Sequence, residues 1–156
     1  MNEKVNTVQQ ILHDFGHYHE IVTLPDNANT AQAAAEAIDC GVAQIAKSII
    51  FRLEPSGSAL LVVASGINRI AEHRVEAIVG EKLTKANANF VKKQTGFVIG
   101  GVAPIGHSNP IQILIDEDLL QYETIWAAAG HPKTVFQMTP EELVEMTGGK
   151  VAKVKE

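Results

Sequence analysis

The sequence has little cysteine and no long hydrophobic run, and each shortage excludes a class of protein. Cys40 is the single cysteine, so a disulfide within the chain is impossible and a reducing compartment is favoured. No stretch reaches the roughly 18 apolar residues of a membrane-spanning helix. The first residues also lack the apolar core of a signal peptide. We therefore expect a cytoplasmic protein with no membrane partner.

An excess of basic charge is also missing, and this limits the nucleic-acid partner. The 156 residues carry 13 Lys and Arg against 18 Asp and Glu, a net charge of −5. Proteins that track along nucleic acid are usually basic. We therefore expect no DNA binding, and an RNA would be held over a short footprint or delivered by another protein. Lys82, Lys85, Lys92 and Lys93 do cluster, either as a solvated face or as a small landing patch for phosphates.

Length and hydrophobic patterning predict one domain over residues 1–156, because this length suffices for one sizeable core. Short strands mix with short helices, and hairpins outnumber βαβ units. We predict an α+β fold, a single compact domain with a curved mixed β-sheet and flanking short helices. The expected helices cover 5–15, 31–39, 70–79, 88–94, 117–121 and 140–146, and the expected strands cover 18–24, 45–54, 59–65, 82–86, 111–115, 124–129, 134–138 and 151–154.

Four positions carry helix-capping signals. Thr30, Asn87 and Asp116 each precede an expected helix and offer a side-chain oxygen to its first backbone N–H groups. Thr139 and Glu142 form a capping box, with proline at the first helical position between them. Between the capped elements, residues 60–64 are apolar without alternation, which predicts a central strand covered on both faces.

Residues 95–107 are unusually rich in glycine. Gly96, Gly100, Gly101 and Gly106 fall within this stretch, together with Pro104. Glycine tolerates positive φ and lets another backbone approach closely, whereas proline fixes φ and removes a donor. The stretch is therefore either a bulged strand crossing a crowded core or a ligand-binding loop with exposed N–H groups.

Three further residues invite a functional reading, and each has a structural alternative. Lys47 lies in the otherwise apolar segment 46–51 and either reaches solvent through its stem or meets a phosphate or a developing negative charge. His131 is held between Gly130 and Pro132, as a solvent-facing loop residue or as part of a site. His107 has the same two readings, and we assign it a structural role.

A metal site is not expected. The spacing of His13 and His17 resembles a helical zinc pair, but no glutamate follows the first histidine and Gly16 ends the helix. His19 lies beyond this break, and the sequence shows no cysteine pair or carboxylate cluster that would complete a site. We predict neither a metal nor a cofactor.

A covalent nucleophile is not expected either. Cys40 follows a helix, where the dipole does not favour a thiolate, so we expect a buried structural cysteine. Ser48 adjoins Lys47, but adjacent strand residues point to opposite faces. Gly100 and Gly101 also lack the spacing of a Walker or dinucleotide-binding motif.

Three motifs together resemble one known family. They are the lysine-containing segment 43–51, the glycine-rich segment 95–106 and the segment 126–132 with its Gly-His-Pro ending, and they follow one another between about residues 30 and 149. In this combination the sequence resembles the YbaK/prolyl-tRNA-synthetase-associated editing domain. The resemblance implies a compact α+β fold with a curved mixed sheet. It also implies metal-free hydrolysis of the ester of mischarged aminoacyl-tRNA, by free-standing members or by members inserted in prolyl-tRNA synthetase.

The resemblance also implies roles for individual residues. Lys47 matches the lysine that holds the terminal adenosine or its phosphate. Gly100, Gly101 and Pro104 match the Gly-x-x-x-Pro loop that receives the aminoacyl group, and backbone N–H groups near the two glycines would stabilise the oxyanion. His131 matches a histidine of the substrate pocket. Lys47, Gly100, Gly101 and His131 are thus the expected catalytic residues.

The substrate pocket is expected to be small. Val102, Ala103 and Ile105 are its candidate walls, beside Pro104, and Ser48 stands where members that prefer alanine commonly have asparagine. The expected function is deacylation of a small amino acid from a tRNA such as tRNA-Pro. The expected partners are the aminoacyl-tRNA acceptor end and an aminoacyl-tRNA synthetase. The alternatives are a non-catalytic binding module for such an end or for a synthetase, and a hydrolase for another small ester or thioester.

Overall fold

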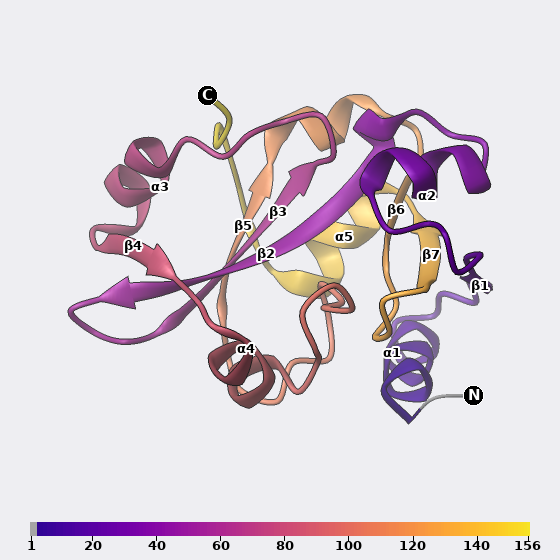
Figure 1. Cartoon of the computed structure of the whole chain (residues 1–156), viewed down its shortest axis with the longest axis horizontal. Coiled ribbons are helices and arrows are strands. Elements are labelled where there is room, and N and C mark those ends of the chain that lie inside the picture. Colours follow the sequence, from indigo (N-terminus) through magenta and orange to yellow (C-terminus); the bar gives the residue numbers. More distant parts are fainter. Residues whose placement is uncertain (1–2) are drawn as a thin grey trace.

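A mixed sheet of eight strands organises the protein, and the computed structural model describes residues 3–156 (Figure 1). The strand order is β1-β7-β6-β2-β3-β5-β8, and β4 pairs separately with β2. Parallel and antiparallel pairs both occur, so the predicted α+β fold with a mixed sheet is confirmed. The strands are β1 (Ile21–Thr23), β2 (Ile45–Glu54), β3 (Ala59–Ser65), β4 (Lys82–Lys85), β5 (Gln112–Asp116), β6 (Ile125–Ala128), β7 (Thr134–Met138) and β8 (Lys150–Ala152).

Short helices flank the sheet, as the alternating pattern predicts. The α-helices are α1 (Glu3–Asp14), α2 (Ala31–Ala37), α3 (Glu72–Val79), α4 (Ala88–Thr95) and α5 (Pro140–Thr147), and single 3-10 turns form η1 (Val42–Gln44) and η2 (Glu117–Gln121). The observed boundaries differ from the predicted ones by three residues or fewer, and two of these differences are at the starts of β1 and α3. β1 is three residues long and begins at Ile21 rather than at residue 18. α3 begins at Glu72 rather than at residue 70, because Ile70 bridges to Lys155 in an extended conformation.

All four predicted capping side chains accept a backbone N–H from the helix that they precede. The N–H···O distances are 3.0 Å for Thr30, 2.8 Å for Asn87, 3.0 Å for Asp116 and 3.1 Å for Thr139. Glu142 completes the capping box by accepting the N–H of Thr139 at 2.7 Å. Local polar chemistry therefore sets where these helices begin.

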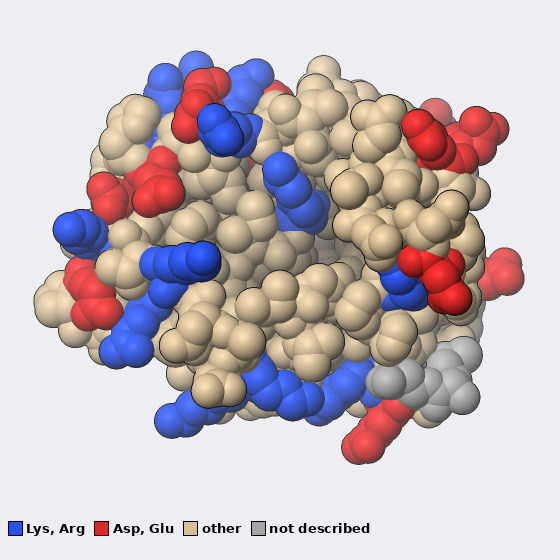
Figure 2. All heavy atoms as spheres, viewed as in Figure 1, with Lys and Arg blue, Asp and Glu red and all other residues tan. Residues whose placement is uncertain are grey.

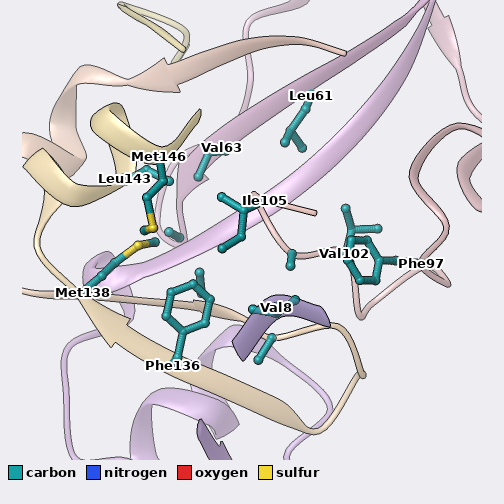
Figure 3. Packing of buried hydrophobic residues seen from close by; sticks show 14 of the residues in the cluster. Val8, Leu61, Val63, Phe97, Val102, Ile105, Phe136, Met138, Leu143 and Met146 are labelled. Carbon is teal, nitrogen blue, oxygen red and sulfur yellow. The ribbon is translucent and has the colours of Figure 1, made fainter. Parts of the chain in front are cut away.

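β3 is the centre of the core, and every one of its residues is buried. On one face lies the largest hydrophobic cluster, in which Val102 and Ile105 reach from the glycine-rich stretch toward Leu61, Val63 and Phe136 (Figure 3). The opposite face packs against α3 and the C-terminal residues. The prediction of a central strand covered on both faces is confirmed, and the glycine-rich stretch is anchored by this core.

β2 has different neighbours along its two edges, and this arrangement positions the site. One edge pairs continuously with β3. The other edge pairs with β6 at Ile45 and Ala46, and with β4 from Phe51 to Glu54. Within the described chain, residues 47–50 have no strand partner on that second edge. We call this segment the open edge of β2.

Two further expectations concern the helices and the cysteine. Within residues 3–156, no helix has the length and apolarity needed to cross a membrane. Cys40 is only partly buried, so the expectation of a buried cysteine is wrong. Its partial burial, together with the neighbouring charge of Asp39, raises the pKa of the thiol.

Candidate active site

Two adjoining hollows lie along the open edge of β2, in the hollowed face that Figure 2 shows over this strand. The small hollow has a volume of about 230 Å³, and Lys47 and Trp126 are among its lining residues. The large hollow, of about 490 Å³, extends toward β4 and α4. Ser48, Gly100 and Val102 line both hollows. The two cavities therefore share a wall that is made by the open edge and the glycine-rich loop, residues 96–106.

The glycine-rich loop meets the Gly-His-Pro loop, residues 129–133, at backbone contact distance. A Cβ atom added to Gly101 would lie 2.9 Å from the His131 carbonyl carbon and 2.9 Å from the Pro132 nitrogen. Gly100 has φ +90°, a left-handed conformation that favours glycine. Gly100 and Gly101 therefore serve different needs: one for an unusual backbone conformation, the other for close approach.

The two glycines also differ in the hydrogen bonding of their N–H groups. Gly101 donates its N–H to the Val98 carbonyl at 3.0 Å, which closes a turn. No acceptor within residues 3–156 receives the N–H of Gly100 or of Val102. The N–H of Gly101 is therefore already used within the loop, whereas the expected role of N–H groups near the two glycines stays a prediction. Gly100 and Val102 are the neighbouring backbone donors that remain available at the hollows.

Lys47 lies at the start of the open edge, and a hydrogen bond to the segment after β3 fixes its side chain. Its Nζ donates to the backbone carbonyl of Asn68 at 2.8 Å. The Asn68 side chain donates to Asp116 at 2.8 Å, and the fully buried Asp116 also accepts the Ser65 N–H at 3.0 Å. Burial lowers the pKa of Lys47, and the nearby charge of Asp116 opposes this shift. The ammonium is thus fixed in place with two of its three N–H donors left for another group.

Ser48 carries an unusual polar atom. Among the described residues, its Oγ is the one buried side-chain oxygen or nitrogen without a hydrogen-bond partner. An unsatisfied buried hydroxyl costs about 1–3 kcal/mol. Ser48 lines both hollows, so this unpaired hydroxyl lies in the wall that the two cavities share.

His131 lies beside the small hollow, whereas its neighbour Pro132 lines it. His131 Nδ1 accepts the Lys133 N–H at 3.2 Å. A neutral imidazole that accepts at Nδ1 carries its proton on Nε2. His131 therefore presents an N–H donor rather than a base, and the contact of its backbone with Gly101 joins the two loops.

The comparisons with known proteins decide the family. The profile of the aminoacyl-tRNA editing domain matches residues 25–146, which include the open edge and both loops. The chain belongs to this family. The fold agrees, because a solved structure described as "a putative trans-editing enzyme for prolyl tRNA synthetase" superposes with a TM-score of 0.94 and 41% identity, over 100% of this chain and 99% of that one. The resemblance to YbaK-like editing domains is confirmed.

Two curated relatives of this editing domain cover most of its length. "Uncharacterized protein YwhH" of Bacillus subtilis (strain 168) is 32% identical over 133 residues, which are 85% of this chain and 84% of the relative. "Putative Cys-tRNA(Pro)/Cys-tRNA(Cys) deacylase EbsC" of Enterococcus faecalis (strain ATCC 700802 / V583) is 22% identical over 125 residues, or 80% of this chain and 76% of the relative.

Not every residue expected at the site of this editing domain lies in the hollows. Lys47, Ser48, Gly100 and Val102 do come together there. Ala103 and Ile105, expected as pocket walls, are instead buried in the largest core cluster. Pro104 is buried and faces a separate hollow on the other side of the loop. The loop thus presents Gly100 and Val102 to the hollows, whereas Ala103 and Ile105 pack into the core.

His107 closes the glycine-rich loop on itself. Its Nε2 contacts the Ala103 carbonyl at 2.7 Å, and its ring packs edge-on against Phe97 at 6.2 Å. Burial lowers the pKa of His107, an effect that the hydrogen bond to Ala103 opposes. These contacts agree with the structural role assigned to His107.

The sequence did not indicate three further residues that line the small hollow. Trp126 lines it from β6, Pro132 from the Gly-His-Pro loop and Asn29 from the segment before α2. Lys133 ties these parts together, because its Nζ donates to the Ala28 carbonyl at 3.0 Å and to the Asn29 side chain. The turn-forming residues 25–29 predict a loop, but nothing in them predicts that this loop packs beside β6.

The histidines of residues 13–19 behave differently from expectation. His13 packs against Tyr18, with ring centroids 4.7 Å apart. His17 and His19 instead meet Glu142, and within residues 3–156 these three form the one group whose ligand atoms could share a metal ion. The reason given against a site, the lack of a completing carboxylate, is therefore wrong. None of the three lines either hollow.

Proposed function

We propose that this editing domain hydrolyses the ester bond of mischarged aminoacyl-tRNA that carries a small amino acid, and that it does so in the cytoplasm without a metal ion. The observation that supports this most is the combination at the small hollow. Gly100 and Val102, whose backbone N–H groups have no acceptor within residues 3–156, line the same small hollow as Lys47, whose ammonium is fixed by the Asn68 carbonyl. In this proposal the two N–H groups of Gly100 and Val102 stabilise the oxyanion of the reaction, and the Lys47 ammonium binds the nucleotide.

The reaction follows from this arrangement. Water adds to the ester carbonyl, and the carbonyl oxygen becomes an oxyanion that the Gly100 and Val102 N–H groups stabilise. One such donor is worth on the order of 10²–10³ in rate. The tetrahedral intermediate then collapses, the bond to the ribose oxygen breaks, and that oxygen takes up a proton. The products are a free amino acid and the uncharged 3′ end.

The attacking water needs a base that the protein does not provide here. Among the described residues that line the small hollow, none carries a carboxylate or an imidazole. A hydroxyl group of the terminal ribose, next to the ester, is placed to orient the water. Lys47 binds the nucleotide through its remaining N–H donors, and positioning of this kind supplies several kcal/mol.

The two hollows divide the substrate between them. The small hollow, about 230 Å³ in volume, takes the aminoacyl group, and its size limits the side chain. The large hollow, with Phe51 and Lys85 in its lining, takes the terminal base, and the phosphate of that nucleotide is left to Lys47, which precedes Ser48 at the boundary of the two hollows. One methylene is worth only roughly 1–3 kcal/mol in such a pocket, so large side chains are excluded better than small ones are told apart.

The test is a deacylation panel on tRNA-Pro charged with Ala, Ser, Cys or Pro, read as free amino acid released under single-turnover conditions. The name of the Enterococcus relative is the reason to include Cys. We expect release of at least one small non-cognate amino acid and no loss of rate in a chelator. Inhibition by a chelator that added zinc reverses would contradict the metal-free reaction.

A matched lysine pair tests the site. Lys47→Ala is expected to lose most of the deacylation rate while its Tm stays near that of the wild type. Lys150→Ala is the control, because Lys150 is an exposed lysine on β8, outside both hollows and outside the lysine cluster of residues 82–93. Equal rates for Lys47→Ala and the wild type would refute the assignment. Binding of charged tRNA without turnover of any substrate would identify a binding module instead.

A further inference from the structure

Two histidines from the link between α1 and β1 converge on one carboxylate of α5. His17 Nδ1 lies 2.9 Å and His19 Nε2 lies 3.0 Å from Glu142 Oε2. The three ligand atoms lie within 4.8 Å of one another. The side chains are 19%, 32% and 17% exposed, so the group is partly enclosed yet open to solvent on one side. More than 120 residues of sequence separate the histidines from the glutamate.

Neighbouring groups already orient two of these three side chains. His17 Nε2 contacts Glu145 Oε1 at 3.0 Å, and a proton on Nε2 that is donated to this carboxylate leaves the Nδ1 lone pair free. The other oxygen of Glu142, Oε1, accepts the Thr139 N–H at 2.7 Å in the capping box. Histidines that bind metals usually donate their second ring nitrogen to a carboxylate in this way. His17 Nδ1 and Glu142 Oε2, which lie 2.9 Å apart as an ion pair without metal, both become available to an ion when the proton between them is released.

We propose that His17, His19 and Glu142 bind a zinc-class divalent transition metal ion. Two imidazole nitrogens and a carboxylate oxygen form a donor set that suits zinc, whereas magnesium and calcium require oxygen ligands. Tetrahedral zinc with bonds of roughly 2.0–2.1 Å places its ligand atoms about 3.3 Å apart. The two nitrogen–oxygen distances of 2.9 and 3.0 Å need to open by only a few tenths of an ångström. Water occupies the fourth position on the open side.

The ion acts as a staple in the fold rather than in the editing reaction. It joins the α1–β1 link to the first turn of α5, two segments that no strand pair connects directly. The three ligands line neither hollow of the candidate active site, so metal binding and deacylation are independent. Because the ligands come together only in the folded chain, binding stabilises the native state.

The experiment uses the full chain without a histidine tag, after treatment with a chelator and its removal. Isothermal titration with zinc is expected to give one site per chain. Cobalt(II) at the same site is expected to give the visible absorption bands of a tetrahedral complex. With free zinc at about 100 times Kd, the Tm is expected to rise by about 5–10 °C.

Variants separate the site from general histidine binding. His17→Asn and His19→Asn are each expected to weaken zinc binding at least about 100-fold and, at the same zinc concentration, to reduce the zinc-dependent rise in Tm to about 1–2 °C or less. Glu145→Gln, which alters only the orientation of His17, is expected to weaken binding by roughly 10- to 100-fold. His13→Asn is the matched control, since His13 lies in the same stretch outside the group, and it is expected to bind like the wild type.

Two results would contradict the proposed zinc site. If zinc leaves the Tm of the wild type unchanged and titration shows no stoichiometric site, the cluster is a hydrogen-bonded group only and the proposal is wrong. If His13→Asn weakens binding as much as His19→Asn, the site lies elsewhere. A circular dichroism spectrum of each variant without metal establishes that it is folded before zinc is added.

Discussion

The contact between the two loops of the site gives a sharp prediction for Gly101→Ala. Gly101 does not have a positive φ, so an added methyl group introduces no left-handed strain there. Its Cβ would instead lie 2.9 Å from two backbone atoms of the Gly-His-Pro loop, where ordinary contact begins at 3.4 Å. Because backbone atoms cannot rotate away, the two loops have to separate by about 0.5 Å or more. Overpacking of this kind costs about 1–3 kcal/mol.

We expect this separation to lower both the Tm and the deacylation rate. At roughly 2–4 °C per kcal/mol for a chain of this size, the Tm of Gly101→Ala falls by about 2–12 °C. The turn that Gly101 closes with Val98 also fixes the neighbouring N–H of Gly100. Misplacement of a catalytic group by 1 Å can cost about 100-fold, so a fall in deacylation rate of roughly 10- to 100-fold is expected. Single-turnover deacylation at 25 °C, well below the Tm, measures it.

Gly80→Ala separates lost stability from lost geometry. Gly80 ends α3 at φ +76° and has no atom within 4 Å of an added Cβ, so its substitution costs about 1–2 kcal/mol of backbone strain alone. It is expected to lower the Tm to a similar degree and to leave the deacylation rate unchanged. The reasoning is refuted if Gly101→Ala keeps both the wild-type Tm and rate, or if Gly80→Ala loses as much rate.

Three further changes test other parts of the molecule. Ser48→Ala removes a buried hydroxyl without a partner, so its Tm should stay the same or rise, while kcat/KM for deacylation falls roughly 2- to 12-fold if the hydroxyl bonds the substrate. Thr139→Ala breaks the capping box of α5 at a cost of about 1 kcal/mol, seen as a fall in Tm of roughly 2–4 °C. Hydrogen bonds from Lys155 and Asn68 lower the pKa of Asp118, so its contribution to stability exists above the ordinary carboxyl pKa and is lost as the pH falls through the folded value. Asp118→Asn should therefore lower the Tm slightly at pH 7, and thermal melts should show this difference vanishing once the pH falls below the lowered pKa of Asp118; a difference that persists at the most acidic pH would contradict the cause assigned.

Local signals in the sequence were sufficient for most of the fold. The caps at Thr30, Asn87 and Asp116 depend on residues three or fewer positions away, and all form. The unbroken apolar run of β3 required cover on both faces and has it. The three motifs that indicated the family also include Lys47 and Gly100, which lie at the same hollow.

What the sequence did not predict depends on contacts between distant segments. The open edge of β2 exists because β6 pairs with only two of its residues and β4 pairs with it only from Phe51 onward, and neither pairing has a local signature. The inward turn of Ala103 follows from the core beneath the loop. His19 and Glu142 lie 123 positions apart, so no spacing rule joins them. Periodicity and capping describe neighbours along the chain, and these features are made by neighbours in space.

The open edge of β2 has a consequence for solubility. Residues 47–50 present backbone N–H and C=O groups that no strand satisfies, and such an edge is a template for strand addition by another chain. Here the glycine-rich loop lies over that edge and blocks it, because Gly100 and Val102 line both hollows above Ser48. Changes that lift the loop would expose the unpaired backbone groups of residues 47–50 on the longest strand. The loop thus covers an edge that is prone to aggregation, and variants in which it lifts should precipitate first on storage.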